Sequence, residues 1–132
     1  LGASGVVIGT RFMASQECMM HQNFKDWMIK ATEKDTMLIQ RSIKNQARVR
    51  RNADAETVLS LEESGNSTLQ DLMPYISGKV GLQSIISGNM DKGTFPVGQS
   101  VGLVHEIKPL ADIVQELVSG ASEVMKYLNK IF

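Results

Sequence analysis

A short apolar run near the start of the chain limits the folds that this sequence can adopt. Residues 5–9 (Gly-Val-Val-Ile-Gly) are rich in β-branched side chains and bounded by glycines, which is typical of a fully buried strand in a parallel sheet. One other β-like run follows, at residues 36–40. A lone buried strand leaves its backbone N–H and C=O groups unpaired on both sides. The run therefore predicts a sheet outside these residues, or a partner chain that supplies one in a homo-oligomer.

Most of the remaining chain carries helical signals. Ser15 is placed to cap a helix over residues 16–30, and Asn52 is placed to cap one over residues 53–64. The last segment is the clearest, because Pro109 suits the first position of a helix and apolar residues follow at i, i+3, i+4 and i+7 spacing. We expect this closing helix to be about 22 residues long, with one apolar face.

Two shorter helices are expected between these. Ser67 and Gln70 resemble a capping box that opens a helix, in which Pro74 causes a stop or a bend. Residues 79–87 suggest another short helix, with Gly88 as its stop. The chain is therefore expected to be mainly α, with five or six helices and one or two short strands.

Length, charge and cysteine content exclude several classes of protein. The 132 residues suffice for one core, whereas a closed (β/α)8 barrel needs about 250 residues. A formal net charge of zero gives no electrostatic reason to expect nucleic acid or a membrane as a partner. No apolar run approaches the roughly 20 residues of a membrane span. The single Cys18 excludes an internal disulfide, which fits a reducing, cytoplasmic compartment.

The strand-like run ends in Gly9-Thr10, which is the first candidate site. A glycine after a buried strand lets backbone N–H groups approach a phosphate, and a threonine hydroxyl adds one more donor. Barrels often hold phosphate at the loops after their last two strands. A plain turn is the alternative that these two residues leave open.

The other reactive side chains form no recognisable constellation. His21 precedes a helix and suits a capping role, and His105 lies in an expected solvated loop. Two scattered histidines and one cysteine make no metal set of usual spacing, and Cys18 has no base near it in sequence. The basic residues between 41 and 51 suit either a phosphorylated cofactor or acidic carrier protein, or a solvated face paired with the acidic residues between 54 and 63.

Several segments together resemble one family. Residues 1–18 (Leu-Gly-Ala-Ser-Gly-Val-Val-Ile-Gly-Thr-Arg-Phe-Met-Ala-Ser-Gln-Glu-Cys) resemble the last barrel strand of nitronate monooxygenases, also called 2-nitropropane dioxygenases, and of the related flavin-type enoyl-acyl carrier protein reductases. Residues 35–52 resemble the family's middle segment, and residues 98–103 (Gly-Gln-Ser-Val-Gly-Leu) resemble its return into the barrel. The resemblance covers most of the chain and keeps its order.

The resemblance implies an α/β parent fold, namely a TIM barrel that binds FMN and carries an inserted helical domain. Residues 1–12 would be the last barrel strand and phosphate loop, residues 13–96 the inserted domain, and residues 97–132 the return to the barrel and the closing helix. Gly9 and Thr10 would bind the FMN phosphate, and Gly98-Gln99 would either approach the flavin or turn the chain. The family's catalytic histidine lies upstream, so the resemblance assigns no catalytic residue and no metal here.

The implied activity is the oxidation of alkyl nitronates, which are small molecules, with oxygen and bound FMN. Two alternatives remain open at this point. One is an NAD(P)H-dependent enoyl-acyl carrier protein or quinone reductase on the same scaffold, and the other is a non-catalytic helical module that binds another chain. We expect the chain alone to be inactive and colourless, because the barrel that surrounds FMN lies outside it.

Overall fold

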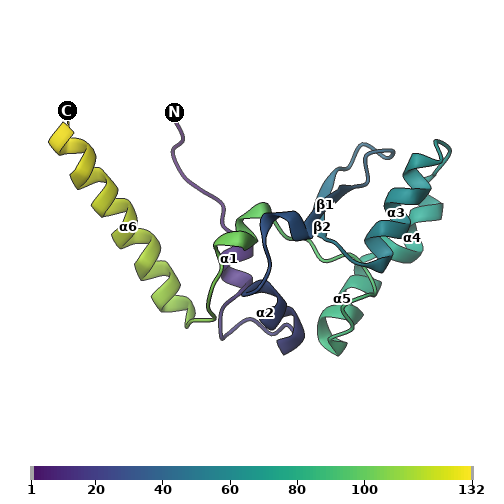
Figure 1. Cartoon of the computed structure of the whole chain (residues 1–132), viewed down its shortest axis with the longest axis horizontal. Coiled ribbons are helices and arrows are strands. Elements are labelled where there is room, and N and C mark those ends of the chain that lie inside the picture. The colour runs from purple at the N-terminus through teal and green to yellow at the C-terminus, as the bar shows by residue number, and fades with distance from the viewer. Residues whose placement is uncertain (1, 132) are drawn as a thin grey trace.

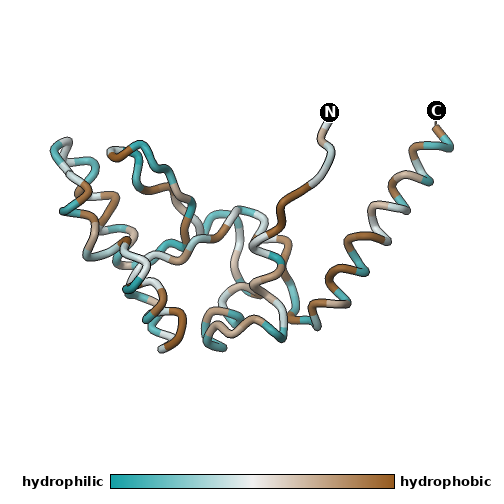
Figure 2. Tube along the Cα trace, turned by 180° about the vertical axis from the view of Figure 1, so that it is seen from behind, coloured by the Kyte–Doolittle hydropathy of each residue, from teal (hydrophilic) through white to brown (hydrophobic). Residues whose placement is uncertain are grey.

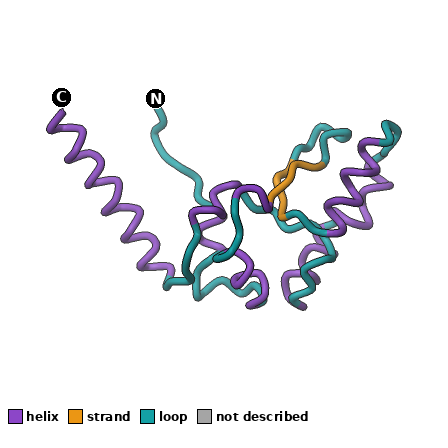
Figure 3. Tube along the Cα trace, viewed as in Figure 1, coloured by secondary structure: helices purple, strands orange, loops and turns teal. Residues whose placement is uncertain are grey.

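The computed structural model describes residues 2–131 and shows a central part from which two arms rise (Figure 1). One arm is the long C-terminal helix, and the other holds the helices and the hairpin of the middle of the chain. The elements are α1 (Thr10–Met13), α2 (Gln22–Met28), η1 (Glu33–Asp35), β1 (Thr36–Ile39), β2 (Ala47–Arg50), α3 (Ala53–Glu63), α4 (Leu69–Ile76), α5 (Gly78–Ser87), η2 (Gln99–Leu103) and α6 (Leu110–Ile131), where η marks a short 3-10 helix. Six α-helices and two strands within the described residues confirm the mainly α composition (Figure 3).

The two strands form one antiparallel hairpin. Met37 lies opposite Val49, and residues 95–97 run along the other edge of β2, where Arg50 N–H donates to the Phe95 carbonyl at 2.8 Å. Strand β2 was not expected, because its arginines made residues 41–51 look like a charged, solvated stretch. Its alternation explains the strand, since Val49 is fully buried between the half-buried Arg48 and Arg50.

Two hydrophobic clusters hold the described residues together. The central cluster joins residues 14–31 to residues 95–104, and its Phe24 and Phe95 rings lie 4.7 Å apart between centroids. The second cluster lies between the hairpin and the α3–α4 pair and consists of Met37, Ile39, Val49, Ala55, Val58 and Leu72. Each cluster therefore joins segments that lie apart in the sequence.

The expected buried strand at residues 5–9 is not formed within this chain. Val6 is 82% exposed and Val7 fully exposed, and the apolar segment projects from the body (Figure 2). The physical reason is that no other described strand lies beside these residues to pair with their backbone N–H and C=O groups. The sheet that would bury them remains a prediction.

Helix α6 has the expected 22 residues, and it is anchored by its first turn. It begins at Leu110, one residue later than expected, and Pro109 supplies the carbonyl that accepts from Ile113 at 3.2 Å. The Glu17 carboxylate accepts from Leu110 N–H at 2.9 and 3.0 Å, which places an anion at the positive end of the helix. Ile113 is buried, whereas most of the apolar face is exposed. None of the helices in residues 2–131 is long and apolar enough to cross a membrane.

The helix expected over residues 16–30 is shorter, and its cap is not Ser15. Helix α2 starts at Gln22, and the Nδ1 atom of His21 accepts from Asn23 N–H at 3.2 Å, which confirms the capping role of His21. Ser15 instead takes part in a short parallel bridge with Lys108, in which Gln16 N–H donates to the Lys108 carbonyl at 2.9 Å.

The expected capping box of α4 is shifted by one residue. Thr68, not Ser67, occupies the cap, and the Asp71 carboxylate, not Gln70, accepts from the Thr68 N–H at 2.8 Å and from its hydroxyl at 2.7 Å. A carboxylate is a stronger acceptor than an amide in this position. Pro74 lies inside α4, which ends two residues later at Ile76.

Two capping boxes give the chain an expected dependence on acid. Hydrogen bonds from Thr32 lower the pKa of Asp35, and hydrogen bonds from Thr68 lower that of Asp71, both below the ordinary 3.8. A lowered pKa stabilises the folded state above the ordinary value, and this contribution is lost as pH falls through the folded value. We expect the melting temperature, followed by circular dichroism, to fall below about pH 4. On acidification, the melting temperature of the double variant Asp35→Asn, Asp71→Asn should fall less than that of the original chain. An equal fall would show that these two carboxylates do not cause the acid dependence.

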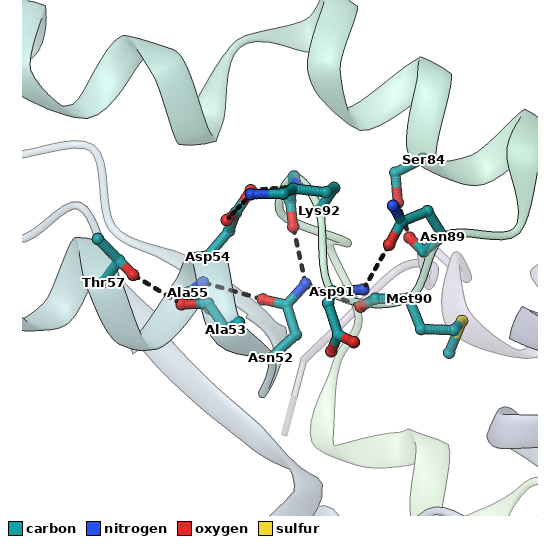
Figure 4. Close-up of polar contacts among 11 residues, drawn as sticks. Asn52, Ala53, Asp54, Ala55, Thr57, Ser84, Asn89, Met90, Asp91 and Lys92 are labelled. Atoms are coloured by element: carbon teal, nitrogen blue, oxygen red, sulfur yellow. Dashed lines mark hydrogen bonds and ion pairs between the residues drawn. The ribbon is translucent and has the colours of Figure 1, made fainter.

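The turn at residues 89–93 is pinned to the start of α3 (Figure 4). Asn52 accepts from Ala55 N–H at 2.9 Å, which confirms it as the cap of α3, and its Nδ2 donates to the carbonyls of Met90 at 3.1 Å and Gly93 at 2.8 Å. The buried Asp54 carboxylate accepts from Gly93 N–H at 2.6 Å. Two side chains at the start of α3 thereby hold the backbone of the turn.

Candidate functional site

The two glycine-containing segments that the sequence singled out meet at Thr10. Thr10 is the first residue of α1 and is 8% exposed. Its Oγ1 accepts from the N–H of Gly98 at 3.0 Å, although 88 residues separate the two positions. Gly98 is in turn the residue before η2, so the starts of α1 and η2 face the same point. The hydrogen bond therefore joins the end of the strand-like run to the segment expected to return into the barrel.

A pocket opens beside this contact. Its volume is about 610 Å3, which is within the range of small-molecule sites. Three parts of the chain line it, namely residues 7–11, η2 with its following residue, and the first two turns of α6. The lining residues are Val7, Ile8, Gly9, Thr10, Arg11, Ser100, Leu103, Val104, Ile113, Glu116 and Leu117.

Hydrogen-bond donors gather at the Gly9-Thr10 end of the pocket. The Gly9 carbonyl accepts from the N–H groups of Phe12 and Met13. The N–H groups of Thr10 and Arg11 lie at the very start of the helix, so they have no acceptor within it. Because the Thr10 oxygen accepts from Gly98, its own hydrogen is left to donate. A Cβ on Gly9 would meet no atom within 4 Å, which shows that its backbone is open on that side. A group with several acceptor oxygens, such as a phosphate, suits these donors.

The charges around the pocket also suit an anion. Arg11 lines it and donates to the backbone carbonyl of Glu106 at 3.1 Å, so its positive charge is not neutralised there. The carboxylate of Glu116 lines it too, but it bonds to the Lys108 ammonium. Lys108 Nζ also lies 2.6 Å from the Glu106 carboxylate. Hydrogen bonds to the carboxylates of Glu106, the larger cause, and of Glu116 raise the pKa of Lys108. The pocket therefore offers Arg11 to a ligand while its one acidic lining group is already paired.

Gly98 lies beside two hydroxyls, those of Thr10 and Ser100. A Cβ at this position would lie 3.4 Å from both Ser100 Oγ and Thr10 Oγ1. The contact therefore involves Gly98, while the neighbouring Gln99 is exposed. The contributions of Ser100 and of α6 were not expected, because neither has a local motif and both depend on how distant segments pack.

The other candidate residues lie outside this pocket. His21 caps α2, His105 is exposed as expected, and Cys18 is half-buried on a different, apolar hollow. No group of three His, Cys, Asp or Glu side chains within residues 2–131 is placed to hold a metal ion.

The basic stretch divides into two parts. Arg51 pairs with Glu56 at the surface, in agreement with a solvated face. Arg50 instead lies over the Trp27 ring, 5.2 Å from its centroid, and donates to the Met90 carbonyl. Loss of solvent around this guanidinium lowers the pKa of Arg50. Arg50 therefore has a structural role that its charge alone did not indicate.

The chain is similar to known proteins in sequence and in fold. The sequence model of the nitronate monooxygenase family matches residues 1–120. The structure is similar to that of FabK from Thermotoga maritima, with 29% sequence identity and a TM-score of 0.82 over 94% of this chain and 39% of FabK. A single-site mutant of the same FabK gives 29% identity and a TM-score of 0.77 over 99% of this chain and 37% of FabK.

The chain thus spans less than two fifths of the length of these FabK structures. The similarity confirms the fold class expected from the sequence, a mainly helical fragment with a barrel parent. The family match includes both segments that meet at Thr10 and reaches the middle of α6. On the strength of this match over most of its residues, the chain belongs to the nitronate monooxygenase family.

Proposed function

We propose that this chain is the C-terminal part of an FMN-dependent oxidoreductase and that it holds the phosphate of FMN beside Gly9 and Thr10. The observation that carries the proposal is the hydrogen bond between Thr10 and Gly98 at the edge of a pocket, in a chain that matches the family over residues 1–120. FMN supplies the redox chemistry when it is bound, and the protein supplies position and charge.

Each residue at this end of the pocket has a role in the proposal. The Thr10 hydroxyl donates to a phosphate oxygen, and the N–H groups of Thr10 and Arg11 add two backbone donors. Gly9 leaves the approach to these groups open. Arg11 balances the phosphate charge from the wall of the pocket, and the Lys108–Glu116 pair keeps the Glu116 carboxylate from repelling it.

The proposed reaction is the oxidation of an alkyl nitronate with oxygen, as the name of the matching family suggests. The alternative is the NAD(P)H-dependent reduction of an enoyl thioester, which the similarity to FabK, a flavin-type enoyl-acyl carrier protein reductase, favours. In both, the residues of this chain position the cofactor, while the catalytic groups come from residues upstream.

We further propose that residues 1–12 complete a barrel, that residues 13–96 form an inserted domain, and that residues 97–132 return to the barrel. The central cluster contains residues from both sides of the boundary at 96, since Phe24 and Met28 pack with Val97 and Val101. The proposed domains therefore share a core, which would hold the phosphate end of the site against the insertion. The exposed segment at residues 5–9 would pair with the upstream barrel or with a second copy.

The test uses a protein in which the upstream barrel precedes these residues. We expect it to retain FMN through gel filtration, whereas the present chain alone stays colourless. Oxygen uptake with an alkyl nitronate would support the proposed reaction, and nicotinamide oxidation with an enoyl thioester would support the alternative. A folded protein of this length that binds no FMN would overturn both.

A further inference from the structure

A second pocket lies between the β1–β2 hairpin and the α4–α5 pair, and it shares no lining residue with the pocket around Thr10. Its volume is about 450 Å3, within the range of small-molecule sites. None of its lining residues carries a charged side chain. Both sides contribute apolar side chains, namely Val49 and Pro96 from the hairpin side and Ile76, Leu82 and Ile85 from the helices.

Gln40 forms a polar end of this pocket, and its side chain is only partly used. It is 8% exposed, and its backbone has a positive φ of 65°. The Glu62 carboxylate accepts from its N–H at 2.8 Å, and its Oε1 accepts from Asn45 Nδ2 at 3.2 Å. Among the residues that the structure describes, none accepts from its Nε2. Gln40 thus keeps donor hydrogens unused at the wall of the pocket, on a left-handed backbone that residues other than glycine seldom adopt.

The start of α5 forms the other polar element. Ser77 has an extended backbone and separates α4 from α5, and both it and Gly78 line the pocket. The Ser77 hydroxyl makes no capping hydrogen bond, and its carbonyl accepts from Gly81 N–H at 3.1 Å. The N–H groups of residues 78–80 therefore have no acceptor within this ten-residue helix. Of these, the N–H of Gly78 belongs to a residue that lines the pocket, and it lies at the positive end of the α5 dipole.

The distance between the walls is fixed by close packing. A Cβ on Gly93 would lie 3.1 Å from the backbone of Gly81, so α5 rests directly on the turn at residues 89–93. That turn is itself pinned by Asn52 and Asp54 (Figure 4). The pocket is therefore a built feature between fixed elements.

We propose that this pocket binds an aliphatic carboxylate, with the hydrocarbon chain between the apolar side chains of the hairpin and the helices and the carboxylate against Gln40 Nε2 and the start of α5. Gln40 Nε2 and the N–H of Gly78 are both donors, and a carboxylate is a ligand that only accepts. The Glu62 carboxylate, which contacts the Gln40 backbone, is already bonded to the N–H groups of Gln40 and Ser42 and to the Ser42 hydroxyl. The hydrogen-bond donors and the apolar lining of the pocket thus fit the same ligand.

The test is a titration of the ¹⁵N-labelled chain with octanoate, read from amide chemical shifts. We expect saturable shifts of the Gln40 side-chain amide and of the backbone amides of residues 77–80. Acetate lacks the chain and octan-1-ol lacks the carboxylate, so each should bind at least about tenfold more weakly. Octan-1-ol binding as tightly as octanoate would show that the carboxylate contributes nothing to binding, and it would overturn the proposal.

Two matched variants place the ligand. Leu82 lines the pocket, whereas Ile86 lies on the same helix, is similarly exposed and does not line it. Leu82→Glu should weaken octanoate binding about tenfold or more, and Ile86→Glu should change it less than about twofold. Gln40→Gly removes the amide, suits the positive φ, and should weaken binding about tenfold. Equal binding by the two glutamate variants would reject this pocket as the site.

Discussion

Replacing Asn52 with alanine should destabilise the chain by about 2–4 kcal/mol, the largest effect that we expect from removing one polar side chain. Asn52 caps α3 through Ala55 N–H and holds the turn at residues 89–93 through the Met90 and Gly93 carbonyls. It is only 8% exposed, so the groups it leaves behind are poorly reached by water. The measurement is urea denaturation followed by circular dichroism.

A second substitution separates the cap from the turn. Asn52→Asp keeps an oxygen for Ala55 N–H but loses both donations and adds a carboxylate near the buried Asp54. It should therefore be about as destabilising as the alanine variant. Asn23→Ala is the control, because Asn23 is exposed and makes one side-chain bond to the Gly88 carbonyl; it should cost less than about 1 kcal/mol. Wild-type stability of Asn52→Asp would show that the bonds to the turn contribute nothing.

The sequence predicted those parts of the fold that depend on interactions between neighbouring residues. The cap at Asn52, the stop at Gly88 and the length of α6 depend on neighbouring residues, and the structure confirms all three. The misplaced start of α2 and the shifted capping box of α4 arose where several residues of suitable type are adjacent. Small polar residues compete for one cap, and the packing of the helix selects among them.

The parts that the sequence did not predict depend on contacts between distant segments. The second strand was hidden because Arg48 and Arg50 mask the buried Val49 between them. At the candidate site, Gly9 and Thr10 were identifiable from a strand-like run followed by a glycine. Their contact with Gly98 and the wall made by α6 were not identifiable, since no local pattern records which segments meet. The burial of residues 5–9 needs a sheet that these residues cannot make alone.

Replacing Thr10 with valine should remove most of the FMN from the protein that carries the upstream barrel. Valine has nearly the same shape but neither accepts from Gly98 N–H nor donates to a phosphate. A hydrogen bond to a charged group contributes about 1.5–3 kcal/mol, so we expect the FMN dissociation constant to rise about 10- to 100-fold. The measurement is a titration of the apoprotein with FMN followed by flavin fluorescence.

The serine variant distinguishes a role in phosphate binding from a role in folding. Thr10→Ser keeps the hydroxyl that joins Gly98 to the ligand, so it should bind FMN within about threefold of the original protein. In the present chain, Thr10→Val leaves the Gly98 N–H without its partner and should cost about 1–2 kcal/mol of stability, which is too little to unfold a longer protein. FMN affinity lost equally in both variants would mean that the methyl packing of Thr10, not its hydroxyl, supports the site. Affinity lost only in the valine variant would mean that the hydroxyl serves the phosphate, and the meeting of α1 with η2 would then be the means by which the two ends of this chain build one binding site.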